Sequence, residues 1–441
     1  MDYEAKKQLE KLVKEHFEEV LKRKISPVPG KDYLQVGGHY YDEQELLNGI
    51  YSVIAGDWAF GRYGLEFEKK FSDYLRIKHV KVTTSGSSAN LLAVRSLRSH
   101  LLKEKALKKG DEIITTASTF PTTVNPIISA DCVPVFLDIK TDTLNVNTDL
   151  LEEAITDKTK AMIFAHTLGN PFNLKKVKEI ADKHGLVFIE DTCDALGSKF
   201  NGEMAGSFGE LSTYSFYPAH HITMGEGGAI ATNKDIIAKI IMSLRDWGRE
   251  CVCLPGHDNT CGGRFQKKCG SLPIGYDHKY VYSHIGYNLK PTEMQSAIGL
   301  AQLDKLESFV KIRRENFATL YALLKEFEDY LILPKSEKGA EPAWFGFPMT
   351  VRKNAGFKKK ELTDFLEANK IGTRPLFCGN VVRQPYFIDY KVKHRIVGDL
   401  KNTDHTMENS LWVGVHPRFR KEHMEYIYSI FEKFFKEKRK P

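Results

Sequence analysis

Two adjacent histidines stand in the segment SFYPAHHITMGEGG, which runs from Ser215 to Gly228. Ser215 ends an apolar run, and His220 and His221 follow it in a loop that leads to a glycine-rich turn. Such a pair could act as an acid–base pair, could bind a metal ion, or could be ordinary solvated loop residues. Adjacent side chains rarely converge on one metal, so metal binding is the least favoured of the three interpretations.

Two other polar segments also follow apolar runs. TTSGSSAN, residues 83–90, ends one strand and opens a helix, so backbone N–H groups and hydroxyls could approach an anion there. A plain turn with serine helix caps explains that segment equally well. IEDTCDALGS places Asp191 directly after an apolar strand, where a carboxylate could pair with the protonated ring nitrogen of a pyridoxal-type cofactor. Taken alone, a helix cap is the simpler interpretation of Asp191.

Seven cysteines are present, and four of them have the spacing C-x57-C-x-C-x7-C. They are Cys193, Cys251, Cys253 and Cys261, the last three in a loop rich in Gly, Pro and Asn. Four thiolates can bind zinc or an iron–sulfur cluster, although structural zinc sites usually have paired CxxC knuckles, which this chain lacks. Unligated thiols are the alternative. Cys269 falls outside this spacing, and Cys132 and Cys378, which also have no partner in it, are expected to be packing residues.

The elements that must position these residues alternate in type. From about residue 78 to residue 288, short β-branched runs alternate with helical patterns, which predicts an α/β fold with a mostly parallel sheet and helices on both faces. Ligands of such sheets bind beyond the carboxyl ends of the strands, and all three polar segments fall at those ends.

We expect three regions in a chain of 441 residues, which is long enough for two domains. Residues 1–30 have apolar positions at helical spacing and are expected to form an amphipathic docking helix. Residues 31–290 form the large domain, with an inserted cysteine loop at 250–270. Residues 291–441 form a smaller α+β C-terminal domain, which begins with a hinge helix from about residue 292 to 327.

Composition limits the possible partners. The formal net charge of +7 comes from 64 basic and 57 acidic residues spread along the chain, a balance that argues against nucleic-acid binding but suits an anionic substrate or an acidic protein. The N-terminal residues are charged throughout, unlike a signal peptide, and no apolar run predicts a membrane span. The cytoplasm is therefore the expected compartment.

In this order and at these separations, the motifs resemble the sugar-nucleotide aminotransferases of the DegT type, which have the type I pyridoxal phosphate (aspartate aminotransferase-like) fold. This resemblance extends over nearly the whole chain. Further motifs that carry the resemblance are GDWAFGRYGLEFE, TFPTTVNPI, VPVFLDIKTDTLNV, HTLGNPF, LRDWGRE and GYNLKPTEMQSAIGLAQL. The resemblance implies cofactor contacts for Gly86, Ser87 and Ser215 (phosphate), Phe120 (ring stacking), Asp191 (ring nitrogen) and Asn288 (phosphate of the neighbouring subunit). It therefore also implies a homodimer with shared active sites.

His220 departs from the family pattern SFYPxK, in which the lysine forms a Schiff base with the cofactor. Histidine cannot form that bond but can transfer a proton. We therefore expect non-covalent pyridoxamine 5′-phosphate, with His220 as the base that removes a proton from a ketimine between cofactor and sugar. Asp194 is a second departure and would tune protonation. Tyr217 could hydrogen-bond to the reacting adduct, and Phe345 could shield it from water, with core packing as the alternative for Phe345.

Combined with the cysteine spacing, this exchange resembles the iron–sulfur 3-dehydrases of dideoxysugar synthesis. The resemblance implies that the four cysteines hold a [2Fe–2S] cluster, which receives electrons from a separate NADH-dependent flavin and iron–sulfur reductase. The expected reaction is C3 deoxygenation of a nucleotide-linked 4-keto-6-deoxyhexose, with CDP the expected nucleotide, for bacterial lipopolysaccharide and O-antigen. The alternatives are a redox-neutral 3-dehydratase, a dTDP-sugar enzyme, and a catalytically idle metal protein on the same scaffold.

Overall fold

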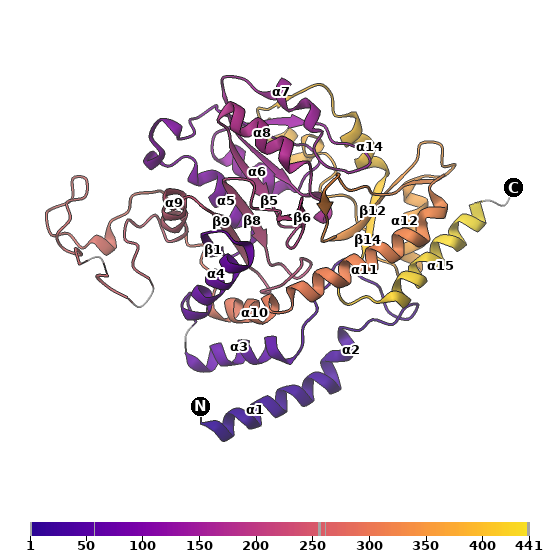
Figure 1. The fold of residues 1–441 in the computed structure, drawn as a ribbon, viewed down its shortest axis with the longest axis horizontal. Coiled ribbons are helices and arrows are strands. Elements are labelled where there is room, and N and C mark those ends of the chain that lie inside the picture. Colours follow the sequence, from indigo (N-terminus) through magenta and orange to yellow (C-terminus); the bar gives the residue numbers. More distant parts are fainter. Residues whose placement is uncertain (1, 57, 255–256, 261, 439–441) are drawn as a thin grey trace.

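A computed structural model describes residues 2–56, 58–254, 257–260 and 262–438, and its centre is an eight-stranded sheet (Figure 1). The strand order is β1-β9-β8-β5-β4-β2-β3-β13. The strands are β1 (His79–Thr83), β2 (Glu112–Thr116), β3 (Val133–Leu137), β4 (Thr159–Ala165), β5 (Val187–Asp191), β8 (Leu211–Ser215), β9 (Gly228–Thr232) and β13 (Arg395–Ile396). Only β9 runs antiparallel to its neighbours, so the sheet is mostly parallel, as the alternating pattern predicts.

Helices cover both faces of this sheet because adjacent residues of each strand point to opposite sides. Ile113 and Ile189 pack in one core with α5 and α9, whereas their neighbours Ile114 and Phe188 pack in another with α7 and α8. The helices of this part are α3 (Glu43–Ala55), α4 (Arg62–Leu75), α5 (Gly86–Ser96), α6 (Pro121–Ser129), α7 (Leu151–Ala154), α8 (Leu174–His184) and α9 (Asp235–Arg245).

The C-terminal part packs a small antiparallel sheet against long helices, with a core rich in aromatic side chains. Its strands are β10 (Leu331–Ile332), β12 (Gly346–Val351) and β14 (Ser410–Gly414). Its helices are α12 (Lys359–Ala368), α13 (Pro385–Asp389), α14 (Lys401–Asn409) and α15 (Lys421–Lys438). A third, minor sheet joins β6 (Lys199–Phe200), β7 (Glu203–Met204) and β11 (Ala340–Glu341).

The expected hinge helix is two helices in the structure, α10 (Glu293–Leu303) and α11 (Leu306–Leu324). The backbone N–H of Lys305, between them, bonds to the carbonyl of Gln302, a tighter i→i−3 turn than an α-helix has. α11 then runs from below the large sheet toward the C-terminal part (Figure 1). The prediction of one continuous helix was therefore wrong at this turn.

The N-terminal segment is helical, as the sequence predicts. α1 (Tyr3–His16) continues through a π-helical turn, Phe17–Leu21, into α2 (Lys22–Lys24). Val13 and Phe17 are buried, while Leu12 and Val20 are exposed, so the helix docks along a narrow stripe. α1 contacts α3 and lies at the outer edge of the molecule (Figure 1).

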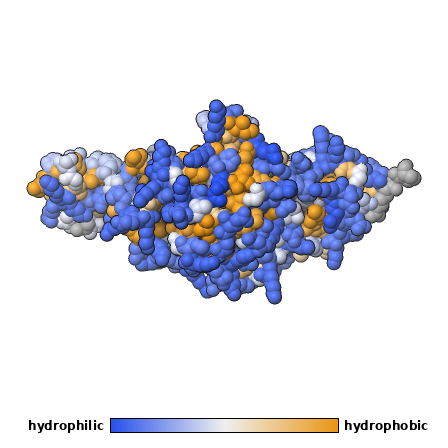
Figure 2. Space-filling model, turned by 90° about the horizontal axis from the view of Figure 1, so that it is seen from above, coloured by the Kyte–Doolittle hydropathy of each residue, from blue (hydrophilic) through white to orange (hydrophobic). Residues whose placement is uncertain are grey.

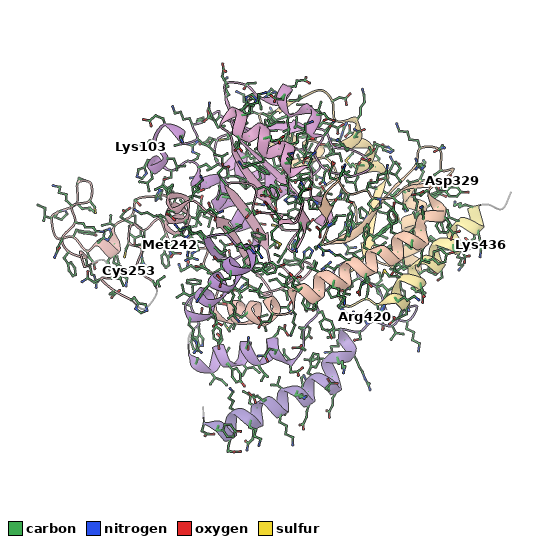
Figure 3. The ribbon with its side chains drawn as sticks, in the orientation of Figure 1. Lys103, Met242, Cys253, Asp329, Arg420 and Lys436 are labelled. Carbon is green, nitrogen blue, oxygen red and sulfur yellow. The ribbon has the colours of Figure 1, made fainter. Side chains whose placement is uncertain are left out.

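A long irregular arm connects α9 to α10, and its described residues form neither α-helices nor strands. The arm projects away from the sheet (Figure 1), and Cys253 lies on it (Figure 3). Its two ends pair at the base, where Trp247 N–H donates to the Tyr287 carbonyl at 2.6 Å and the Leu289 carbonyl accepts from Thr84 N–H after β1. The arm therefore leaves and rejoins the fold beside the polar segment at residues 83–90.

Polar side chains dominate the face seen in Figure 2, with apolar residues gathered near its middle. Within the described residues, no helix is long and apolar enough to cross a membrane.

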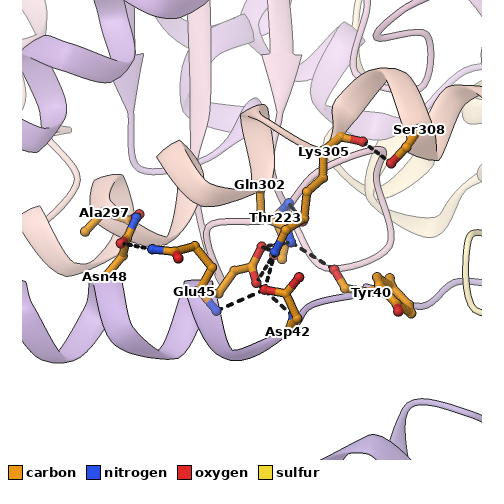
Figure 4. Close-up of polar contacts among 10 residues, drawn as sticks. Tyr40, Asp42, Glu45, Asn48, Thr223, Ala297, Gln302, Lys305 and Ser308 are labelled. Atoms are coloured by element: carbon orange, nitrogen blue, oxygen red, sulfur yellow. Dashed lines mark hydrogen bonds and ion pairs between the residues drawn. The ribbon is translucent and has the colours of Figure 1, made fainter. Parts of the chain in front are cut away.

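A buried ion-pair network joins α3 to the turn between α10 and α11 (Figure 4). The Lys305 ammonium lies 2.7 Å from both oxygens of Glu45, whose side chain is 4% exposed, and 2.5 Å from Asp42. Gln302 also donates to Glu45 and accepts from Thr223 N–H at 3.2 Å. The network therefore reaches the loop that carries the two histidines.

We expect Lys305→Met to lower the free energy of unfolding by about 2–3 kcal/mol, because it leaves a buried carboxylate without its cation. Urea unfolding near neutral pH measures this. Lys311→Met is the matched control, because Lys311 lies on α11 and faces Glu315 in an exposed ion pair. Its loss should lower the free energy of unfolding by at most about 1 kcal/mol. Equal losses in the two variants would show that the network contributes no special stability.

Candidate active site

One cavity, of about 340 Å³, lies beyond the carboxyl ends of β5 and β8, at the N-terminus of α5. It brings together segments that are far apart in the sequence. Of the predicted site residues, those that line it are Gly86, Ser87, Phe120, Asp191, Cys193, Asp194, Ser215, Tyr217, His220 and Phe345. Arg374, Phe377 and Trp412 of the C-terminal part complete its wall.

Asp191 is the last residue of β5 and is 4% exposed. Its carboxylate accepts hydrogen bonds from Asn90 and Thr123, both at 2.8 Å, and from the backbone N–H of Cys193 at 3.2 Å. Thr213 of β8 donates to Asn90 at 2.6 Å and so fixes that amide. The structure therefore fixes a carboxylate at the cavity wall, and the helix-cap interpretation of Asp191 is wrong because the next element after β5 is the short strand β6, not a helix.

An anion cradle lies at the start of α5. Ser85 caps this helix by accepting from Ser88 N–H at 3.1 Å. At Gly86, an added Cβ would lie 2.5 Å from the Cβ of Ser215 and 3.0 Å from the sulfur of Cys193, so the cradle has no room for a side chain there. Unpaired N–H groups at a helix N-terminus, together with the Ser215 hydroxyl, form a site suited to a phosphate.

His220 and Asp194 face each other inside the cavity. The Nε2 atom of His220 lies 3.3 Å from a carboxylate oxygen of Asp194, and the two side chains are 16% and 13% exposed. The ring of Phe345 lies 5.2 Å from the imidazole, and that of Tyr217 lies 6.4 Å away. A carboxylate at this distance holds the imidazole in one orientation.

His221 has a different environment. Its Nε2 atom bonds to the carbonyl of Ala343, and its side chain is buried outside the cavity. Burial, together with repulsion from Arg313, holds the pKa of His221 well below its usual value. His221 is therefore a neutral, structural residue in this arrangement.

The three described cysteines of the predicted set line two different cavities. Cys193 lines the 340 Å³ cavity that also holds His220. Burial, and to a lesser extent the Asp191 carboxylate, raise the pKa of its thiol well above the usual value. Cys251 and Cys253 line a separate small cavity on the projecting arm, beside Arg264 and His278 (Figure 3 labels Cys253). The fourth predicted ligand, Cys261, lies outside the described residues. In the part of the chain that is described, no three His, Cys, Asp or Glu side chains are placed to hold a metal ion.

Asn288 lies at the base of the arm and does not line the cavity. It pairs with Asp246 through the backbone, and its side-chain oxygen accepts from Lys290 at 2.7 Å.

The sequence interpretation missed Asn90 and Thr123, which hold Asp191. Both lie within motifs that it had singled out, TTSGSSAN and TFPTTVNPI, but their partner is far away in the sequence.

The fold and this cavity define a protein built like the pyridoxal phosphate-dependent enzymes of type I. The model of the DegT/DnrJ/EryC1/StrS aminotransferase family matches residues 41–432, and the chain belongs to this family. The expected fold class is therefore confirmed.

Among its relatives, the lipopolysaccharide biosynthesis protein RfbH of Salmonella typhimurium is 50% identical over 430 residues, 98% of each chain. The dTDP-4-dehydro-2,6-dideoxy-D-glucose 3-dehydratase of Saccharopolyspora spinosa is 44% identical over 92% of this chain and 87% of its own length. The structure of Escherichia coli GDP-4-keto-6-deoxy-D-mannose-3-dehydratase with bound hydrated PLP matches with a TM-score of 0.81 and 29% identity, covering 90% of this chain and 99% of that one.

Proposed function

We propose that this protein is a pyridoxamine 5′-phosphate-dependent 3-dehydratase of a nucleotide-linked 4-keto-6-deoxyhexose. One observation carries the proposal: His220 occupies the position of the family's Schiff-base lysine and faces Asp194 inside the cavity at 3.3 Å. This pair can move a proton but cannot hold the cofactor covalently. The relatives named as sugar 3-dehydratases support the same assignment.

The residues present fit such a cofactor. Asp191, held by its three donors, suits a protonated ring nitrogen, and the cradle at Gly86 and Ser215 suits the phosphate. Phe120, which is 52% exposed in the single chain, offers a flat face for the ring. When bound, pyridoxamine phosphate supplies an amine for the keto group and a conjugated ring that accepts electrons.

Each remaining residue then has a role of its own. His220 takes the proton whose removal lets the C3 hydroxyl leave, and Asp194 keeps the imidazole oriented toward that proton. Tyr217, 49% exposed at the cavity, is placed to donate a hydrogen bond to the reacting groups. Phe345, 8% exposed, packs beside His220 and Trp412 and excludes water from that side.

The proposal includes a homodimer. Asn288 lies outside its own cavity at the base of the projecting arm, which suits a residue that reaches the phosphate of a neighbouring subunit's cofactor. The half-exposed faces of Phe120 and Tyr217 fit the same idea, since a second subunit would cover them.

The finer substrate assignment is CDP-6-deoxy-L-threo-D-glycero-4-hexulose, the substrate of the iron–sulfur 3-dehydrase that the motifs resemble. The relatives named as 3-dehydratases have dTDP- or GDP-linked sugars in their names, so the nucleotide must be tested directly by comparing CDP, dTDP and GDP substrates. The 50% identity to a lipopolysaccharide biosynthesis protein supports a role in bacterial surface polysaccharide, and we propose that the reaction takes place in the cytoplasm.

We further propose that the arm carries an iron–sulfur site that receives electrons from a separate reductase. Cys251 and Cys253 share one small cavity, and the C-x57-C-x-C-x7-C spacing supports a cluster. The described residues of one subunit do not assemble the ligand set, since Cys193 lies in the other cavity.

A redox-neutral 3-dehydratase is the second candidate. The separation of Cys193 from Cys251 and Cys253 favours it, because a reaction without electron transfer needs no cluster at the cofactor. Such an enzyme would release an unsaturated product that hydrolyses, and glutamate would restore the amine of the cofactor.

We expect His220→Asn to lower C3 deoxygenation by about 10²–10⁴-fold, with pyridoxamine phosphate affinity within roughly threefold, because the base is lost while the cofactor contacts stay. Turnover and equilibrium dialysis measure the two quantities. The matched control is His221→Gln, which keeps a donor for the Ala343 carbonyl and should lower turnover by less than about tenfold. Undiminished turnover by His220→Asn would remove the residue from the mechanism.

We expect the anaerobically reconstituted, dithionite-reduced protein to give the low-temperature EPR spectrum of a reduced [2Fe–2S] centre. Cys253→Ser should remove the signal and the deoxygenation, whereas Cys269→Ser, on the same arm but outside the spacing, should keep both. A competently reconstituted protein that gives no signal, with a Cys253→Ser variant that stays fully active, would establish the redox-neutral reaction instead.

A further inference from the structure

Arg313 of α11 is the largest fully buried side chain near the cavity, at 0% exposure. Its guanidinium faces backbone carbonyls rather than acids. The Nη1 atom donates to Phe345 at 3.0 Å and to Trp344 at 3.4 Å, and Nη2 donates to His220 at 3.1 Å and to Ala219 at 3.5 Å. No carboxylate in the described part of the chain forms an ion pair with it.

These four carbonyls belong to two separate segments. Ala219 and His220 lie in the loop after β8, and Trp344 and Phe345 lead into β12 of the C-terminal part. The two segments meet in the cavity, where the His220 and Phe345 rings lie 5.2 Å apart. A planar group with fixed donor directions can hold two such segments at one separation, which a flexible ammonium does less well.

The guanidinium also places a positive charge behind the cavity wall. Burial lowers the pKa of Arg313 to about 9, against the attraction of Asp194, so the group keeps its charge near neutral pH. A buried cation without a carboxylate in contact is costly. Asp194, the partner of His220, is the acid whose charge attracts this guanidinium.

We propose that Arg313 is a positioning residue for the reaction: it fixes the loop of His220 against the Phe345 segment and so sets the place of the imidazole. This inference rests on the proposed role of His220. Arg313 itself does not line the cavity, and it acts only through the residues that do.

Arg314 provides a matched control on the same helix. It also donates to carbonyls, those of Pro342, Glu341 and Gly197, at 3.0–3.2 Å. Through Pro342 and Glu341 it ties α11 to the stretch of chain just before β12, but among the described residues it donates no hydrogen bond to the His220 loop. A general loss of packing would affect both arginines, whereas a loss of positioning would affect only Arg313.

The experiment measures kcat, KM and pyridoxamine phosphate affinity for Arg313→Met and Arg314→Met, with urea unfolding of each. For Arg313→Met we expect kcat to fall about 10–100-fold while KM and cofactor affinity stay within about threefold, because a displacement of about 1 Å at the reacting groups costs that much. Arg314→Met should lower kcat by less than about threefold. If Arg313→Met does not fold, the pair Arg313→Lys and Arg314→Lys gives the same comparison.

Equal losses of kcat in the two variants, or a loss confined to unfolding stability, would overturn the inference. His220→Asn in the same series separates the two claims. If it leaves turnover unchanged, the proposed function fails. If it lowers turnover and Arg313→Met does not, only the inference about Arg313 fails.

Discussion

The buried carboxylate of Asp191 is the constraint on which the rest of the site depends. A carboxylate removed from water is destabilising by several kcal/mol unless hydrogen bonds or a cation compensate it. Here the donors come from α5, α6 and the turn after β5, and β8 holds one of them in turn. One charge therefore fixes four elements relative to one another. The same elements carry the Gly86 cradle and Ser215, so the hydrogen bonds to the Asp191 carboxylate also set the geometry of the anion site.

Two further groups of polar contacts hold the histidine loop from behind. The network of Glu45, Gln302 and Lys305 reaches Thr223, and Arg313 holds the carbonyl of His220 itself. Gln302 and Lys305 lie where α10 passes into α11, and Arg313 lies further along α11. The position of the imidazole is thus determined by elements that begin about 70 residues further along the chain, not by the loop alone.

The alternating pattern predicted the mostly parallel sheet, and the polar segments after its strands predicted that Gly86, Asp191 and Ser215 share one edge of it. The family resemblance added other cavity residues, among them Phe120 and Phe345, whereas Phe377 and Trp412 were not predicted. Asn90, Thr123 and Arg313 were missed, since their partners come from other elements and no local spacing encodes them. The cysteine set shows the same limit. Spacing along the chain predicted one ligand set from Cys193, Cys251 and Cys253. Cys193 follows the buried strand β5, however, whereas Cys251 and Cys253 lie on the projecting arm.

The most direct test of the central claim, a non-covalent cofactor with His220 as its base, is release of tritium from the aminomethyl carbon of labelled pyridoxamine phosphate bound to the protein. If His220 is the base, tritium release to water requires the 4-keto sugar nucleotide and falls at least about 100-fold in His220→Asn. Equal release by the wild-type protein and the variant would show that another group removes the proton, and would contradict the account.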